Sequence, residues 1–376
     1  MKQKRILIVS HPRDLHARAT AFAVRKKGHI CEEFFCADLP TRTSITLHEG
    51  NEATTGRTAT VLRRSNEEIE RGNRFDTIWL RRVDDAWLPD SMHLGDREVA
   101  TRHCTRLLWD FLASLDGPSV YWVSHYQRHV THTHKVYQLR EARRAGLAVP
   151  RTTVTNDPAE MRAFVEACGG VAAYKLLERA SWETADGRRF ATYTSSISTA
   201  DLQPEDTLRL CPAILQPLVE KAFEVRVACF GDHLVALQID SQSDDRARID
   251  WRMGQWFVDM KPYSLPHAVA ESTRRFLRST GMATASVDFI VTPQGEHVFL
   301  EANPQGQFLW LEERASLPLL DIASDYLIAG DPEFCYDREA PAVSWSEYLA
   351  HSGDDIDALT GDHVAERGGL RIFADD

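Results

Sequence analysis

The sequence predicts a mixed α/β protein, and two parts of the chain, one near each end, carry that prediction. Residues 5–10 form a short apolar run typical of a buried strand, and the helical stretch over 14–27 ends at Gly28, a natural C-cap residue. With a second strand at 31–35, these elements form a β-α-β opening, which indicates a partly parallel sheet. Near the other end, residues 287–301 place two strand-forming runs around a Pro-Gln-Gly turn, as a β-hairpin does.

Composition and charge limit the class of protein. A chain of 376 residues is long enough for two or three domains. The formal net charge of -11 argues against a nucleic-acid partner. No apolar run approaches the length of a transmembrane helix, so no membrane association is expected. The seven cysteines are odd in number and contain no C-x-x-C pair, which predicts reduced thiols in a cytoplasmic protein.

Strands and helices alternate between these two ends. Strands are predicted at 75–82, 120–123, 171–177, 213–219, 223–230 and 234–239, with a hairpin over 178–192 and short strands joined by loops over 41–60. Helices are predicted at 96–115, 135–146, 158–168, 267–280 and 315–328. No G-x-G-x-x-G motif follows the first strand, so a dinucleotide site is not indicated.

Three oxygen-bearing side chains lie at neighbouring ends of the predicted hairpin. Asp288 sits near the start of its first strand, and Glu301 and Asn303 lie at the end of its second. Residues two apart point the same way on an extended chain, so all three side chains can converge. Two carboxylates and an amide oxygen are hard ligands that suit Mg²⁺ held together with nucleotide phosphates. A hairpin whose acidic ends are merely solvated is the alternative that this pattern leaves open.

Two lysines stand out because lysine is scarce in this chain. Lys135 opens a predicted helix, and Lys175 lies inside an apolar strand, where it needs an anion or a path to solvent. On separate elements, they are candidates for two phosphate contacts. Gln216 precedes the kink at Pro217, where a side-chain oxygen and unpaired backbone groups can read an adenine edge.

Other polar clusters are less specific. Arg81 and Arg82 end a strand, and adjacent strand residues face opposite sides, so only one can point into a given cleft. Arginine is suited to bidentate contact with a carboxylate or a phosphate, although a solvated sheet edge explains the two arginines equally well. Four histidines at 125, 129, 132 and 134 have spacings that can bind metal. No cysteine or acidic residue lies close by, which favours surface or core histidines.

The order of these residues resembles that of the ATP-grasp ligases. The matching positions are Lys135, Lys175, Gln216-Pro-Leu-Val219, Glu224-x-Arg226, Asp288 and Glu301-x-Asn303. More narrowly, several runs resemble the microviridin-type peptide-maturing enzymes, the graspetide synthetases. These runs include Trp79-Leu-Arg-Arg82, Lys135-x-x-Gln-Leu139, Tyr174-Lys175, Gln238-Ile-Asp-Ser-Gln242, Asp250-Trp-Arg252 and the segment from Phe299 to Glu312. Departures are Val83, where the relatives usually carry proline, and the histidine-rich segment.

The resemblance implies a fold and a set of domains. The expected fold is ATP-grasp, in which two α+β lobes clamp ATP, preceded by an α/β N-terminal domain. The expected boundaries are 1–125 for the N-terminal domain, 126–217 for the central lobe, 218–330 for the C-terminal lobe and 331–376 for an acidic appendage.

The resemblance also implies roles for the candidate residues. Lys135 and Lys175 would neutralise ATP phosphates, and Asp288, Glu301 and Asn303 would hold Mg²⁺. Gln216 with the backbone at Leu218 and Val219 would hold adenine, and Glu224 would accept ribose hydroxyls. Arg226 and Arg252 would act in catalysis by steadying the acceptor carboxylate and the charge of phosphoryl transfer, unless they form structural salt bridges. Arg81 and Arg82 would bind the substrate.

The implied reaction is an ADP-forming ligation. A carboxylate of an Asp or Glu in a ribosomal precursor peptide, with a leader and an acidic core, becomes an acyl phosphate. A Thr, Ser or Lys of the same peptide then closes an ester or amide macrocycle. One alternative is a ligase that joins an amino acid to a small molecule or a protein terminus. Another is a catalytically silent nucleotide-binding regulator. The oligomeric state is left open, a homodimer included.

Overall fold

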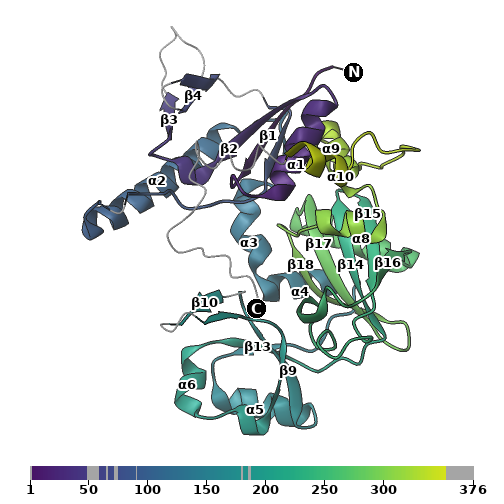
Figure 1. Ribbon diagram of the computed structural model, residues 1–376. Helices are drawn as coiled ribbons and strands as arrows, with labels where there is room; N and C mark the ends of the chain where they lie inside the picture. The colour runs from purple at the N-terminus through teal and green to yellow at the C-terminus, as the bar shows by residue number, and fades with distance from the viewer. Residues whose placement is uncertain are drawn as a thin grey trace.

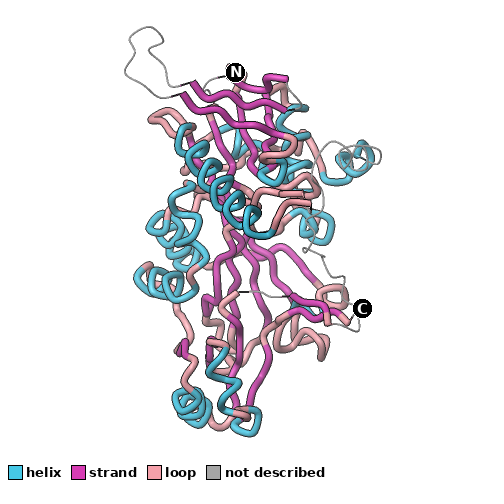
Figure 2. Tube along the Cα trace, turned by 90° about the vertical axis from the view of Figure 1, so that its left-hand side faces the viewer, coloured by secondary structure: helices cyan, strands magenta, loops and turns pink. Residues whose placement is uncertain are grey.

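The computed structural model describes residues 2–352 apart from 49–58, 65–66, 72–74, 90, 179–180 and 185–187. It places an N-terminal domain at one end of an elongated molecule and a central lobe at the other, with a C-terminal lobe between them (Figure 1, Figure 2). Each of the three parts is built around its own sheet. Among the described helices, none combines the length and apolar composition that a bilayer crossing requires.

The N-terminal domain is a parallel sheet covered on both faces by helices. Its strand order is β2-β1-β6-β7, with β1 (Arg5–Ser10), β2 (Ile30–Phe35), β6 (Thr77–Leu80) and β7 (Tyr121–Val123). Ile6 and Ile8 face α1 (Leu15–Lys26), whereas Leu7 and Val9 face α2 (Leu94–Ser114). Alternation along a strand explains why this short run is apolar throughout. The β-α-β opening predicted from the sequence is therefore confirmed.

A second, antiparallel sheet of three strands belongs to the same half of the chain. It is formed by β3 (Thr43–His48), β4 (Ala59–Arg64) and β5 (Glu67–Arg71), each paired with the next. The prediction of strands over 41–60 matches the part of this stretch that is described. Residues 49–58, which fall within the predicted stretch, lie outside the described residues.

The central lobe is a small antiparallel sheet backed by one helix. Its strand order is β12-β9-β13-β8, formed by β8 (Thr153–Thr155), β9 (Val171–Leu176), β12 (Ser195–Ser198) and β13 (Ala213–Gln216). Helix α5 (Pro158–Ala167) is capped by the Asp157 side chain, which accepts from Ala159 N, with Pro158 in the first turn as the sequence predicted. Helix α6 (Glu205–Leu210) and the hairpin of β10 (Ser181–Glu183) and β11 (Arg189–Ala191) complete the lobe. Asp186 and Gly187, expected at the hairpin tip, lie outside the described residues.

The C-terminal lobe is a five-stranded antiparallel sheet of order β16-β15-β14-β17-β18. Its strands are β14 (Phe223–Phe230), β15 (His233–Ile239), β16 (Met260–Tyr263), β17 (Thr284–Val291) and β18 (His297–Asn303). One face packs on α4 (Lys135–Arg144) and α7 (His267–Thr280). In the chain, α4 comes directly after the short helix α3 (His129–Thr133), and α7 comes directly after β16. The other face, which carries Ala228 and Phe230, packs on α8 (Leu309–Ala315) and α9 (Leu319–Ala329).

The end of the described chain returns to the N-terminal domain. Helix α9 packs on α1, so one hydrophobic cluster is shared by the N-terminal sheet and the C-terminal lobe. The structure corrects the start of the helix predicted over 315–328: it is α9, which begins at Leu319, and a separate helix, α8, ends at Ala315. The chain breaks between them because Ser316 adopts a left-handed conformation (φ 52°) and Pro318 follows.

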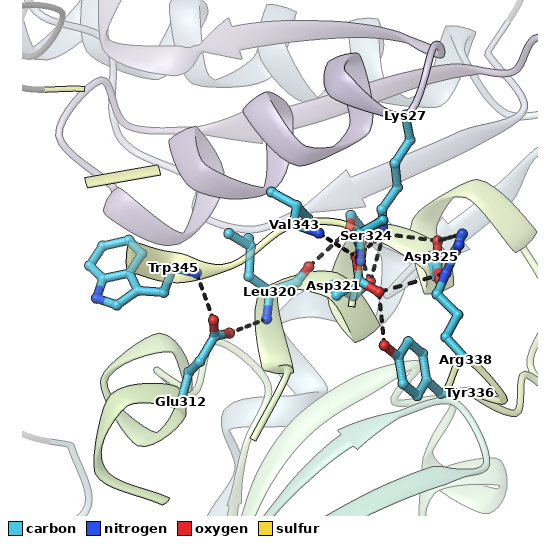
Figure 3. A network of polar contacts seen from close by, with 11 residues as sticks. Lys27, Glu312, Leu320, Asp321, Ser324, Asp325, Tyr336, Arg338, Val343 and Trp345 are labelled. Atoms are coloured by element: carbon cyan, nitrogen blue, oxygen red, sulfur yellow. Dashed lines mark hydrogen bonds and ion pairs between the residues drawn. The ribbon is translucent and has the colours of Figure 1, made fainter. Parts of the chain in front are cut away.

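Buried carboxylates fasten the segment that follows α9, as Figure 3 shows. Asp321 is fully buried and accepts from Lys27 Nζ at 2.8 Å, from the Tyr336 hydroxyl at 2.8 Å and from Val343 N at 3.1 Å. Glu312 accepts from Leu320 N at 2.7 Å and from Trp345 N at 2.6 Å, at the start of α10 (Trp345–Ser352). The described part of the predicted acidic appendage is thus packed on α1 and α9, and residues 353–376 lie outside the described residues.

We expect Asp321→Ala to destabilise the protein by about 3–5 kcal/mol, because it removes the acceptor of the Tyr336 hydroxyl and of the Val343 amide and leaves the buried Lys27 with less compensating charge, although Lys27 keeps Asp325 at 2.9 Å. Glu347→Gln is the matched control: it removes an ion pair with Lys26 at a partly exposed position and should cost less than about 1 kcal/mol. Urea unfolding measures both, and limited proteolysis should cut within 331–344 only in the Asp321 variant. Equal losses in the two variants would contradict this role.

Candidate active site

The predicted convergence of the hairpin ends is visible in the strand register. In the β17–β18 pair, Asp288 lies opposite Glu301 and Ser286 lies opposite Asn303. Cross-strand partners project from the same face of a sheet, so the two carboxylates are neighbours. The ladder shifts between Asp288 and Phe289, which makes the pairing irregular next to these side chains.

Each carboxylate has its own cationic partner. Lys135 Nζ donates to Glu301 Oε2 at 2.6 Å, and Arg226 Nη1 donates to both Asp288 oxygens at 3.1 and 3.2 Å. Burial by itself would raise the pKa of Glu301, but the charge and hydrogen bond of Lys135 lower that pKa to about 2. Burial raises the pKa of Asp288, with Arg226 acting against the rise and Glu301 adding to it. Glu301 is therefore ionised at neutral pH.

Lys175 reaches the same site from the central lobe. It lies on β9, and burial lowers the pKa of its ammonium group. The nearby carboxylates of Glu301 and Asp250 partly offset this by raising that pKa. In the part of the chain that the structure describes, no hydrogen bond or ion pair holds its ammonium group. Lys135 and Lys175 thus approach Glu301 from different elements, as the sequence analysis expected of two phosphate contacts.

The link between the two lobes carries the residues expected around adenine and ribose. Gln216 ends β13, is buried, and donates from Nε2 to Thr152 Oγ1 at 3.0 Å, which leaves its amide oxygen as an acceptor. Leu218 is exposed, and Val219 follows it in the same link. Glu224 is the second residue of β14, is buried, and accepts from Lys221 Nζ at 2.8 Å.

Arg252 is part of a bridge between the lobes. Its Nε and Nη2 donate to the two oxygens of Asp250 at 2.8 and 2.5 Å, and Asp250 also accepts from Thr194 N of the central lobe at 3.0 Å. The Arg252 guanidinium lies 5.8 Å from the Tyr193 ring centroid. Its pKa is raised by Asp250 against the effect of burial, with Glu301 and Asp288 contributing, so Arg252 also faces the paired carboxylates.

Arg81 and Arg82 are placed differently from one another. Arg81 is 1 % exposed; its Nη1 donates to Gln305 O at 2.5 Å and its Nε lies 3.3 Å from Asp14 Oδ2. Arg82 Nε lies 2.6 Å from the same Asp14 oxygen, and its side chain is 40 % exposed. Both residues follow β6, which ends at Leu80, and both meet one Asp14 oxygen, so the expected separation to opposite sides is not seen; they differ in exposure, and Arg82 is the one open to a molecule in solvent. The substrate contact expected of Arg81 does not fit this burial.

The histidine-rich segment is structural where it is described. His132 is buried and donates from Nε2 to Thr280 O at 3.0 Å. Over the described residues, no group of three or more His, Cys, Asp and Glu side chains has the geometry of a metal site. At the hairpin, the carboxylates of Asp288 and Glu301 and the amide oxygen of Asn303 are hard oxygen donors, the kind that Mg²⁺ binds together with phosphate oxygens and water.

Sequence reasoning missed two supporting residues of this site. Gln138 donates to Ala302 O at 2.8 Å and accepts from Ala302 N at 3.0 Å, which fixes the backbone between Glu301 and Asn303. Its place three residues after Lys135 puts both on one helix face, a signal that was available in the sequence. His16 accepts from Phe308 N at 2.8 Å and from Leu309 N at 3.1 Å, a contact across 292 residues that no local pattern could indicate.

Comparison with known proteins places this geometry in a class. No family model matches the chain, and no curated protein matches it either. Among solved structures, a RiPP-associated ATP-grasp ligase of Chryseobacterium gregarium, in complex with ADP and a leader and core peptide, is similar. Its TM-score is 0.78 with 23% identity, over 91% of this chain and 100% of that one. The fold is therefore that of the ATP-grasp ligases, as expected.

Two macrocyclases of Microcystis aeruginosa narrow the comparison. MdnC, bound with precursor peptide MdnA, has a TM-score of 0.75 with 24% identity over 86% of this chain and 99% of that one. MdnB has a TM-score of 0.71 with 26% identity over 86% and 99%. Both are macrocyclases and one is bound with a precursor peptide, so the resemblance of the sequence motifs to peptide-maturing ATP-grasp enzymes is confirmed.

The buried side chain of His16 should make the free energy of unfolding depend on pH. Burial lowers the pKa of His16 to about 3, with Arg81 adding to the effect and Asp14 opposing it. Between pH 6.5 and about 3 the unfolded chain binds a proton that the folded chain does not, so stability falls as the pH falls. We expect His16→Gln to remove a slope approaching about 1.4 kcal/mol per pH unit. Unfolding free energies measured from pH 7 to 4 should diverge between variant and wild type; parallel profiles would contradict this.

Proposed function

We propose that this protein is an ATP-dependent ligase that activates side-chain carboxylates of a ribosomal precursor peptide and closes ester or amide crosslinks within that peptide. The observation that carries the proposal is the pair of opposed carboxylates, Asp288 and Glu301, surrounded by cations from separate parts of the chain. A magnesium nucleotide offers positive charge to the carboxylates and negative charge to the lysines, so it complements both sets at once.

In this proposal Asp288, Glu301 and Asn303 hold the metal, and Lys135 and Lys175 contact the phosphates. Bound Mg²⁺ supplies charge neutralisation on the phosphate oxygens. The Gln216 amide oxygen accepts a hydrogen bond from adenine, and the backbone of Leu218 and Val219 supplies further donors and acceptors. The Glu224 carboxylate accepts from the ribose hydroxyls. Lys135 then exchanges its carboxylate partner for phosphate, which its single flexible ammonium group allows.

The acceptor carboxylate is steadied by Arg252 and Arg226. An oxygen of that carboxylate attacks the terminal phosphorus of ATP, the bond to the bridging oxygen breaks, and ADP leaves. A hydroxyl or amine of the same peptide attacks the acyl carbon, phosphate leaves, and the proton of the nucleophile passes to solvent. Arg252 keeps its planar orientation through Asp250, so its position is set before substrate binds.

A precursor peptide is the substrate that the neighbours support. The structures similar to this chain include enzymes bound with a leader and core peptide or with a precursor peptide. The chain carries a formal net charge of -11, so attraction of an acidic core depends on local arginines such as Arg82 and Arg252, which remain partly exposed. All seven cysteines are free thiols, which suits the cytoplasmic location that we propose.

We expect Lys175→Met to separate binding from stability. The substitution removes a largely buried ammonium group that makes no hydrogen bond or ion pair with the described residues and acts on Glu301 only from a distance, so thermal stability should change little. ATP affinity should fall about ten-fold or more, since hydrogen bonds to charged groups contribute about 1.5–3 kcal/mol. Titration calorimetry with ATP and Mg²⁺ measures the affinity. Lys261→Met, on the exposed edge strand β16, is the matched control, and wild-type affinity in Lys175→Met would assign that lysine a structural role.

The mass of the product tests the proposed reaction. Incubated with ATP, Mg²⁺ and its precursor peptide, the protein should lower the peptide mass by one water per bond formed, and the modified peptide should behave as an intact ring under tandem mass spectrometry. Glu301→Ala should form no ADP, whereas Glu296→Ala, on the exposed hairpin turn, should match wild type. A peptide that instead gains the mass of an amino acid would favour the alternative ligase. A protein that binds ATP but forms no ADP, with or without the peptide, would favour the regulator.

A further inference from the structure

The segment that leaves the metal-binding strand is held by the N-terminal domain. Residues 303–309 connect β18 to α8, and His16 of α1 accepts hydrogen bonds from Phe308 N at 2.8 Å and Leu309 N at 3.1 Å. The His16 ring also meets the Phe308 ring edge to face at 4.9 Å. These contacts fix the end of the segment at the first turn of α8.

A second contact fixes its middle. Arg81, at the end of β6, donates from Nη1 to Gln305 O at 2.5 Å, and Arg226 donates from Nη2 to Gln307 O at 3.4 Å. Arg226 is the same residue that binds Asp288. One guanidinium therefore joins the metal carboxylate to the connecting segment, and a second joins that segment to the N-terminal sheet.

Asp14 organises both N-terminal residues. It caps α1 by accepting from His16 N at 3.0 Å and Ala17 N at 3.3 Å, and its carboxylate lies 3.3 Å from Arg81 Nε. Because His16 Nε2 accepts two amide hydrogens, the ring proton resides on Nδ1, which lies 3.8 Å from Asp14 Oδ1. The negative charge of Asp14 on the Nδ1 side of the ring favours the tautomer in which Nε2 is the acceptor.

The opposite side of the segment leaves no room for movement. A Cβ added to Gly306 would lie 2.1 Å from Ser286 Oγ, and Ser286 is the β17 residue opposite Asn303. Asn303 itself accepts from Gln305 N through its side-chain oxygen at 2.9 Å, and its carbonyl accepts from Gly306 N at 3.0 Å. The orientation of the Asn303 amide is therefore coupled to Gln305, the residue that Arg81 holds.

We infer that Asp14, His16 and Arg81 are positioning residues of the active site: from the N-terminal domain, they hold the 303–309 segment so that Asn303 faces Glu301 and Asp288, and they thereby set the affinity for the magnesium nucleotide. This inference rests on the proposed function. It makes the N-terminal domain a structural part of the metal site.

The test is Mg²⁺-dependent binding of ADP, measured by titration calorimetry without peptide. His16→Leu removes the acceptor at similar volume, and it should raise the Mg²⁺ concentration at half-saturation about ten-fold or more, as supporting groups of metal ligands do. His16→Gln restores an acceptor and should recover most of this loss. His297→Leu is the matched control, because His297 is also buried and hydrogen-bonded but lies at the far end of the same hairpin.

A double-mutant cycle with Asn303→Ala shows whether the effect passes through Asn303. In that background His16→Leu should change the Mg²⁺ dependence less than about two-fold. If His16→Leu does not fold, Arg81→Met is measured in the same way. The inference would be overturned if folded His16→Leu, or Arg81→Met in its place, kept the wild-type Mg²⁺ concentration at half-saturation. It would also be overturned if His297→Leu shifted that concentration equally, or if the effects of His16→Leu and Asn303→Ala were fully additive. Wild-type protein that binds no magnesium nucleotide would overturn the proposed function with it.

Discussion

Two carboxylates placed opposite each other at a partly buried site are the constraint on which the rest of the structure depends. Asp288 and Glu301 lie on adjacent strands, and each makes the ionised form of the other less favourable. Such a pair persists in the folded chain only with compensating cations. Arg226 and Lys135 supply them directly, and Arg252 and Lys175 add charge from farther away.

These cations come from separate elements of the fold. Lys135 starts α4, Lys175 lies on β9 of the central lobe, and Arg226 lies on β14 of the C-terminal lobe. From the N-terminal domain, Arg81 holds the segment that follows β18 and is paired with Asp14, not with the two carboxylates. Charge balance at one pair of side chains thus requires the lobes to close on the same point, which is also where a nucleotide with its metal ion would be clamped. The alternation of β14 permits this, because Arg226 and Ala228 share the face that α8 covers.

Local signals in the sequence predicted most elements and the centre of the site. Strand alternation and turn residues predicted the hairpin that brings Asp288 to Glu301, and the Gly281 cap ended α7 where the structure ends it. Residues two apart at a strand end predicted the placement of Asn303. The family resemblance added the lysines and the arginines as a set, and their roles stay predictions.

What the sequence could not indicate depends on contacts between distant segments. His16 looked like one more residue of a helix, because its partners are the amides of Phe308 and Leu309. Arg81 read as a surface cation until its burial between Asp14 and Gln305 was known. The break at Ser316 and the fastening of 331–352 by Asp321 are likewise decided by tertiary packing, which overrides the continuous helical pattern over 315–328.

The most direct test follows the oxygen atoms of the peptide. If these residues orient a carboxylate to attack ATP, a precursor whose acidic side chains carry the heavy isotope of oxygen must transfer one labelled atom to inorganic phosphate for each crosslink formed. Mass spectrometry of the released phosphate gives the answer. Label in phosphate in proportion to the crosslinks is the predicted result, and crosslinked peptide that retains all of its label would contradict the account.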